Sequence, residues 1–178
     1  MSKQRIIKEV ITFIIPLLIA YIILSYFIMV SVVQSGSMEP ALPVGDTVFY
    51  NRTAYWFSEP QRGDIVVFYS DEFGEYWGKR IAGIPGDEVK FREGKYIVNG
   101  MVVEEEYISD EIKSDCKEDF VVPDGCYFML GDNREISNDS RFWKNPYIKK
   151  GKIVGKYMGK IPFSFQFDVW YPIKSLFD

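Results

Sequence analysis

The chain has 178 residues, of which 26% are charged and 17% aromatic, a composition typical of a folded protein and not of a disordered one. A net charge of −4 without a basic cluster excludes the usual nucleic-acid-binding surface. Histidine is absent, which removes the commonest metal ligand and the commonest general base together. A hydrolase made from this chain would therefore need lysine, a carboxylate or the amino terminus as its base.

The first feature along the chain is an apolar run at 10–33 that contains no charged residue. It is longer than the roughly 20 residues that cross a bilayer core, and it exceeds the apolar core of about 7–15 residues in a cleavable signal peptide. We therefore expect a retained transmembrane helix at 10–33. The preceding residues 1–9 are mainly basic in charge, so the positive-inside rule predicts a cytoplasmic amino terminus and an extracytoplasmic domain at 34–178.

From Pro43 onward the sequence changes to short runs of β-branched and aromatic residues separated by turn residues. Asn99-Gly100, between two such runs, is a strong hairpin signal. The pattern predicts a mainly antiparallel β domain, with the charged segment 91–122 as a small inserted subdomain. The expected strands are Thr47–Tyr50, Asp64–Tyr69, Lys79–Ala82, Glu88–Phe91, Tyr96–Val98, Met101–Val103, Val121–Val122 and Tyr127–Leu130.

Two serines, Ser35 and Ser37, follow the apolar run closely and are separated only by Gly36. If the helix ends at Val33, a tether of about four residues keeps Ser37 within roughly 13 Å of it. Any chemistry by Ser37 would then take place at the membrane surface.

A serine nucleophile in this chain could use a lysine as its base. The amine must be neutral, because an ammonium has no lone pair, and burial in apolar surroundings can lower the pKa of a lysine by several units. Lys79 has the best setting, between an aromatic pair and the run IAGI, although the same pattern is common at a solvated strand end. A second polar cluster, Gly131–Arg141, is either a loop held by its own hydrogen bonds or a loop that positions a catalytic group.

Four segments together resemble the bacterial type I signal peptidases, membrane-anchored serine proteases that remove signal peptides from exported proteins. The segments are SGSMEP from Ser35, RGDIVVF from Arg62, KRIAGIPGD from Lys79 and GDNREISNDSR from Gly131, in the family's order behind an apolar anchor. Each is weak alone, whereas the four in order are specific. The resemblance implies an antiparallel β fold of the signal-peptidase/LexA-like type and a Ser/Lys dyad, which agrees with the missing histidine.

The resemblance also implies a role for each matching residue. Ser37 would be the nucleophile and Lys79 the general base, while Ser137 would orient the lysine amine. No metal or other cofactor is implied. The residues expected to support the dyad are Ser35 in an oxyanion hole with the backbone N–H of Ser37, Met38 in a shallow substrate pocket, and Arg80, Asp139 and Arg141 as braces of the loop.

The partners that the resemblance implies are secretory preproteins and the lipid bilayer, with no nucleic acid and no metal. The expected state is a monomer in the bacterial cell membrane. A peptidase dedicated to a narrow set of substrates stays open as an alternative. So does a non-proteolytic assembly factor on the same fold, although the retained serines and lysine disfavour it.

Two structural questions also stay open at this point. Cys116 and Cys126 could form a single disulfide, since the domain is expected outside the cytoplasm. The aromatic triplet Tyr55-Trp56-Phe57 could belong to the core or could contact the bilayer interface.

Overall fold

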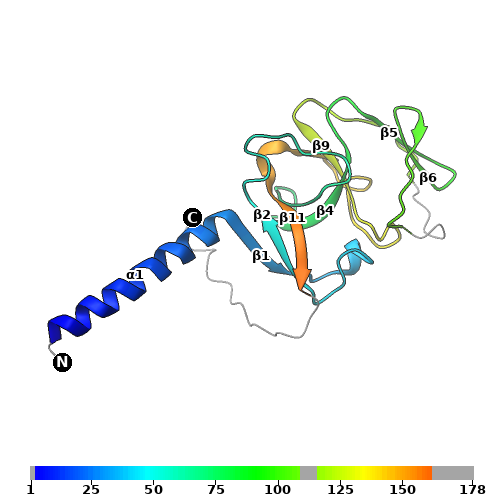
Figure 1. Ribbon diagram of the computed structural model, residues 1–178. Helices are drawn as coiled ribbons and strands as arrows, with labels where there is room; N and C mark the ends of the chain where they lie inside the picture. Colours follow the sequence, from blue (N-terminus) through cyan, green and yellow to red (C-terminus); the bar gives the residue numbers. More distant parts are fainter. Residues whose placement is uncertain (1–2, 109–115, 162–178) are drawn as a thin grey trace.

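Figure 1 shows a computed structural model of the chain, which describes residues 3–108 and 116–161. A long helix, α1 (Lys3–Phe27), extends from a β-rich domain as a separate arm. The domain contains a seven-stranded and a four-stranded sheet, and their strand pairs are antiparallel. The predicted mainly antiparallel β fold, preceded by one apolar helix, is confirmed.

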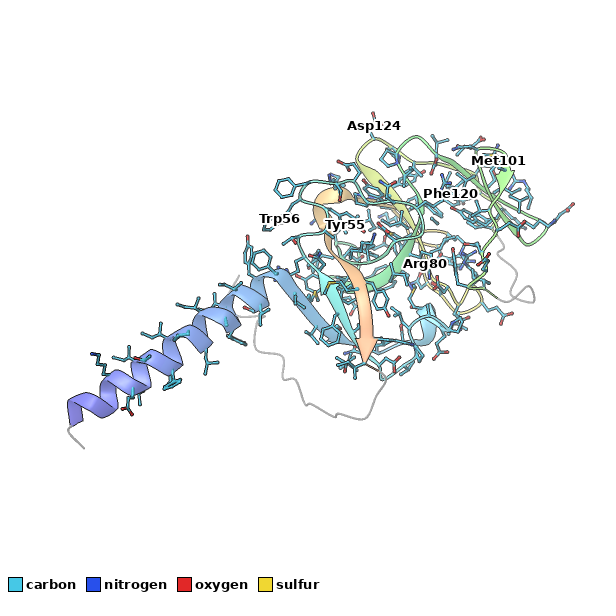
Figure 2. All side chains as sticks on the ribbon, viewed as in Figure 1. Tyr55, Trp56, Arg80, Met101, Phe120 and Asp124 are labelled. Atoms are coloured by element: carbon cyan, nitrogen blue, oxygen red, sulfur yellow. The ribbon has the colours of Figure 1, made fainter. Side chains whose placement is uncertain are left out.

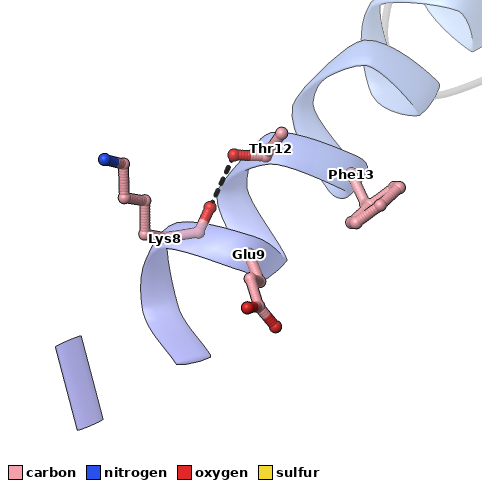
Figure 3. A pocket seen from close by; sticks show the side chains of 4 residues that line it. All are labelled: Lys8, Glu9, Thr12 and Phe13. Carbon is pink, nitrogen blue, oxygen red and sulfur yellow. Dashed lines mark hydrogen bonds between the residues drawn. The ribbon is translucent and has the colours of Figure 1, made fainter. Parts of the chain in front are cut away.

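The part of α1 from Lys8 to Phe27 is long and apolar enough to cross a membrane, with a mean hydropathy of 2.5, and none of it is buried. Its hydroxyl side chains bond back to the helix itself. Thr12 Oγ1 donates to the carbonyl oxygen of Lys8 at 2.7 Å (Figure 3), and Ser25 Oγ donates to that of Ile22 at 2.9 Å. These two hydroxyls therefore add no unsatisfied polar group to an apolar surface.

The predicted carboxyl end of the helix is wrong, because α1 ends at Phe27 and residues Ile28–Val32 form strand β1. This strand pairs with β2 (Thr47–Asn51) along its whole length. A continuous apolar run suits a helix and a strand alike, and its β-branched residues favour the strand once a partner is available. Ser37 consequently lies beyond a strand of the sheet and not on a short tether to the helix.

The seven-stranded sheet has the order β1-β2-β11-β3-β4-β9-β10, so the last strand in the chain lies between β2 and β3. Strands β10 and β11 were not predicted. β11 contains Gly155 and Gly159, and its register shifts against both neighbours, which breaks the two-residue alternation that indicates a strand. The other strands of this sheet are β3 (Ile65–Ser70), β4 (Glu75–Gly83), β9 (Cys126–Leu130), β10 (Tyr147–Lys149) and β11 (Ile153–Ile161).

The four-stranded sheet, in the order β7-β6-β5-β8, lies between β4 and β9 in the chain. It begins before the predicted insertion of 91–122, whose first residue falls inside β5. Its side chains Val89 and Phe91 pack with Phe128 and Leu130 of β9 in one buried cluster, so the two sheets share a core. The strands are β5 (Glu88–Arg92), β6 (Lys95–Val98), β7 (Met101–Val102) and β8 (Phe120–Val121), with the predicted hairpin turn between β6 and β7.

Cys116 and Cys126 are both free thiols that pack, partly buried, against this shared core. Cys116 Sγ lies 3.9 Å from the carbonyl oxygen of Arg141. The two cysteines are therefore not linked in this structure.

Candidate active site

Lys79 and Ser137 meet in the interior of the domain. Lys79 lies in β4, directly opposite Val66 of β3, and Ser137 lies in the loop Gly131–Arg141 after β9, called the Ser137 loop below. Lys79 is 2% exposed and Ser137 is 3% exposed. Lys79 Nζ donates a hydrogen bond to Ser137 Oγ at 3.0 Å. An amine and a hydroxyl are thus bonded to each other where water has little access.

Burial has the largest influence on the Lys79 amine, and it lowers the pKa of Lys79 from 10.5 to about 8. A buried ammonium loses its hydration, so the neutral form is favoured. The Asp139 carboxylate raises this pKa in part, the Arg141 guanidinium lowers it, and the Asp132 carboxylate raises it. A lysine with such a pKa keeps a usable neutral fraction near neutral pH, as a general base requires.

Ser37 lies in a short 3-10 helix, η1 (Gly36–Met38), that follows β1. Its side chain is half-buried, and the exposed Ser35 hydroxyl donates to Ser37 Oγ at 3.3 Å. The backbone N–H of Asn133 donates to the Ser37 carbonyl oxygen at 3.1 Å. The predicted nucleophile is therefore tied directly to the Ser137 loop.

Gly131, the first residue after β9, lies between the Ser37 and Ser137 segments. A Cβ atom on this residue would overlap the Ser137 side chain and would lie 2.5 Å from the Ser37 carbonyl oxygen. Real Cβ atoms do not approach another heavy atom that closely. The absence of a side chain here is what allows Ser37 to lie next to the Lys79–Ser137 pair.

A buried ion pair holds the far end of the Ser137 loop. Arg141 donates to Asp139 through Nε at 2.8 Å and through Nη2 at 2.9 Å, with both side chains at most 1% exposed. The second oxygen of Asp139 also accepts from the backbone N–H of Gly131 at 3.0 Å. Two parallel charge-assisted bonds fix the geometry of this end of the loop.

Arg80 braces the same loop, but its partner is Asp132 and not the Asp139–Arg141 pair with which it was grouped. Arg80 donates to Asp132 through Nε at 2.8 Å and through Nη2 at 2.6 Å, and its Nη1 donates to the Gly63 carbonyl oxygen at 2.8 Å. Asp132 is fully buried. The sequence marked Asp132 only as one of several polar residues in a cluster, because nothing local indicates that a residue 52 positions earlier is its partner.

Met38 points into the protein, where it is 2% exposed and packs with Leu42, Val48 and Ile65 in one cluster. This packing fixes η1 on the seven-stranded sheet. The expected role of Met38 in a substrate pocket stays a prediction.

The aromatic triplet after β2 is divided between the core and the surface. Tyr55 packs against the core and its hydroxyl donates to Asp64 Oδ2 at 2.8 Å. The Trp56 ring lies 6.0 Å and 6.1 Å from the rings of Tyr26 and Phe27 at the end of α1 (Figure 2). Phe57 is 98% exposed. Trp56 thus lies beside the end of the apolar helix, and Phe57 is open to solvent.

The site presents hydroxyl groups, one amine and paired charges. In the part of the chain that the structure describes, no three cysteine or acidic side chains gather so that they could hold a metal ion. The buried carboxylates Asp132 and Asp139 are instead paired with guanidinium groups.

Comparisons with known proteins agree on one family. The family model described as signal peptidase, peptidase S26, matches residues 6–161. Signal peptidase I of Pseudomonas aeruginosa is 31% identical over 84% of this chain and 68% of its own length. Signal peptidase IB of Staphylococcus aureus is 31% identical over 91% of this chain and 93% of its own. A crystal structure of a signal peptidase I from Enterococcus faecalis is similar at 32% identity and a TM-score of 0.48, covering 56% of this chain and 97% of that one.

These matches define the class of protein as a serine endopeptidase, a hydrolase. Because the family model covers most of its length, the chain belongs to the signal peptidase family, peptidase S26. Membership of this family supports the cleavage of signal peptides as its reaction.

Proposed function

We propose that this chain is a membrane-anchored signal peptidase in which Ser37 is the nucleophile and Lys79 the general base. The observation that carries the proposal is the state of the Lys79 amine, which is buried, bonded to Ser137 Oγ at 3.0 Å and lowered in pKa to about 8. Such an amine can accept a proton near neutral pH, whereas a solvated lysine is almost fully charged. The substrates are secretory preproteins, as the family membership suggests.

The first half of the proposed reaction forms an ester. Neutral Lys79 accepts the hydroxyl proton of Ser37 while Ser37 Oγ attacks the carbonyl carbon of the scissile peptide. The Lys79 ammonium then gives the proton to the leaving amine, so the mature protein departs and the signal peptide stays bonded to Ser37. Without substrate, Lys79 Nζ donates to Ser137 and Ser37 Oγ accepts from Ser35, and catalytic hydrogen bonds commonly tighten only in the complex.

The second half of the reaction hydrolyses that ester. A water molecule attacks the acyl carbon, and Lys79 takes its proton and passes it to the departing Ser37 Oγ. The signal peptide leaves with a free carboxylate, and both side chains return to their starting protonation states. Ser137 orients the lysine amine in both halves, because its hydroxyl accepts one of the amine's hydrogen bonds.

Ser35 and the backbone N–H of Ser37 would stabilise the oxyanion. The Ser35 hydroxyl lies 3.3 Å from Ser37 Oγ, which brings it within reach of an oxygen on the carbon that Ser37 attacks. Ser37 lies in the first turn of η1, where N–H groups have no carbonyl partner inside the helix. One such donor contributes about 2.7–4 kcal/mol to the transition state.

The substrate would bind as an extended strand, so that alternate side chains point into the protein. Two shallow pockets would then select small residues one and three positions before the cleaved bond. Met38, the last residue of η1, is the proposed apolar wall of one pocket.

The proposed location is the bacterial cell membrane, with α1 spanning the bilayer, the amino terminus in the cytoplasm and the β domain outside. The length and hydropathy of Lys8–Phe27 support a span. Trp56, which lies beside the helix end, and the exposed Phe57 that follows it in the chain are suited to the bilayer interface, where aromatic side chains are enriched. A single copy has the whole set of groups that the reaction uses, so we propose a monomer.

The test is cleavage of a model preprotein by the purified full chain in detergent. Ser37→Ala and Lys79→Ala should each abolish cleavage while leaving the circular dichroism spectrum unchanged. The matched control is Lys149→Ala, since Lys149 is an exposed lysine at the end of β10, and its activity should stay within about twofold. Normal cleavage by either site variant would contradict the proposal.

A further inference from the structure

Residues 103–108, which follow β7, pass from the second sheet to the neighbourhood of the Ser137 loop. Their side chains differ in exposure, since Glu104 and Glu106 are exposed whereas Glu105 and Tyr107 are half-buried. The inward-facing pair contacts two arginines that hold the Ser137 loop. The segment that follows β7 of the four-stranded sheet thus places two side chains against the arginines that hold the Ser137 loop.

Glu105 pairs with a buried arginine of the Ser137 loop. Its Oε1 accepts from Arg134 Nη2 at 2.5 Å, and the Arg134 side chain is 1% exposed. Arg134 Nε in turn donates to the carbonyl oxygen of Gly131 at 2.9 Å. A guanidinium this deeply buried needs compensating charge, so Glu105 favours the position in which Arg134 holds Gly131.

Tyr107 contacts the second arginine. The Arg80 guanidinium carbon lies 3.8 Å from the centre of the Tyr107 ring, a stacking distance. The same guanidinium holds Asp132 in the Ser137 loop. The Tyr107 hydroxyl donates to Glu105 Oε1 at 2.6 Å, so the two inward-facing side chains are themselves joined.

We propose that Glu105 and Tyr107 are positioning residues, which hold the Ser137 loop against Lys79 through the two arginines. This inference rests on the proposed function of Ser37 and Lys79. Neither positioning residue touches the reacting groups. They act by fixing the position of the Ser137 loop through its arginine contacts, so the segment after β7 of the four-stranded sheet takes part in catalysis.

The proposal predicts a particular change in kinetics. A looser Ser137 loop admits water to the Lys79 amine and displaces Ser137 Oγ from it. Added hydration reduces the influence that lowers the pKa of Lys79, so the acidic limb of activity moves to higher pH. Neither Glu105 nor Tyr107 is among the residues proposed to bind the substrate strand, so KM should change little while kcat falls.

The experiment measures kcat, KM and the pH profile of kcat/KM for the full chain in detergent. Glu105→Gln keeps the size of the side chain and removes its charge, and kcat should fall about 10- to 100-fold. Tyr107→Ala should act similarly, while Tyr107→Phe keeps the ring on Arg80 and should restore most of kcat. The matched control is Glu106→Gln, the exposed neighbour, which should stay within about twofold.

Three results would overturn the inference. One is unchanged kcat and an unchanged acidic limb in Glu105→Gln and Tyr107→Ala. Another is a loss of kcat in Tyr107→Phe as large as in Tyr107→Ala. The third is a loss of kcat with the acidic limb in place, which would indicate a merely structural role. In each case an inactive Ser37→Ala would leave the proposed function standing, so the two failures are distinguishable.

Discussion

Lys79 and Ser37 lie in contrasting surroundings. Lys79 is 2% exposed, and the Ser137 loop beside it is held by the ion pairs of Arg80 and Arg141 with two buried carboxylates. Ser37 is half-buried on a three-residue helix, and its neighbour Ser35 is exposed. A lysine base has to be shielded from water to be neutral, whereas a nucleophile has to be accessible to its substrate. Substitutions on the Lys79 side should therefore alter folding stability and pH dependence, and those on the Ser37 side should alter the rate alone.

The largest effect is expected for Asp139→Asn, on the Lys79 side. It leaves the buried Arg141 guanidinium without its carboxylate, which should lower the free energy of unfolding by about 3–5 kcal/mol. Cleavage should fall as well, because the Ser137 loop loses its brace. Urea unfolding in detergent measures the change.

The control for this substitution is Asp124→Asn in an exposed turn far from α1 (Figure 2), with an expected change below about 0.5 kcal/mol. An Asp139→Asn variant as stable as the parent would show that the Ser137 loop is held by something other than this ion pair.

Ser35→Ala tests the solvent-accessible surroundings of Ser37. Removal of one oxyanion donor should lower kcat about 10²- to 10³-fold. The free energy of unfolding should stay the same, because Ser35 is exposed. Ser35→Thr keeps a hydroxyl and should keep most of the activity. Full activity in Ser35→Ala would remove this residue from the oxyanion hole.

Lys79→Met should abolish cleavage and yet stabilise the fold near neutral pH. The pKa of Lys79 is lowered from 10.5 to about 8, so below pH 8 the buried ammonium costs about 3 kcal/mol. Removing the ammonium removes this cost, but losing the hydrogen bond to Ser137 offsets about 1 kcal/mol of the resulting gain in stability. Urea unfolding at pH 7 should therefore show a free energy of unfolding about 2 kcal/mol higher than that of the parent protein.

The extra free energy of unfolding of Lys79→Met should shrink as pH rises. The unfolded state binds more protons than the folded state between pH 8 and 10.5, so the parent protein becomes more stable through that window. Above 10.5 the lysine is neutral in both states and the gain should be gone. A gain that does not vary with pH would mean that burial of charge is not its cause.

Local sequence signals predicted much of the β domain. Turn residues and β-branched runs located the strands from β2 to β9, and Asn99-Gly100 located the hairpin between β6 and β7. Ser37, Lys79 and Ser137 were singled out by their motifs, and the structure brings all three to one place around Gly131. These features depend on residues close together in the chain.

Several features that sequence reasoning missed depend on distant partners. The helix ends at Phe27 because the following residues pair with β2, and only the folded sheet provides that partner. The bonds from Arg80 to Asp132 and from Arg134 to Glu105 join segments far apart in the sequence. Acidic residues in a charged segment carry no local sign that one of them turns inward.

The dependence of kcat/KM on pH tests the central claim most directly. The full chain in detergent cleaves a model preprotein without titratable side chains near the cut, and the rate is followed from about pH 6 to about pH 11. Because neutral Lys79 is the proposed base, activity should rise with pH and level off with an apparent pKa near 8. An apparent pKa near 10.5, the value of a solvated lysine, or a profile without an acidic limb would contradict the account.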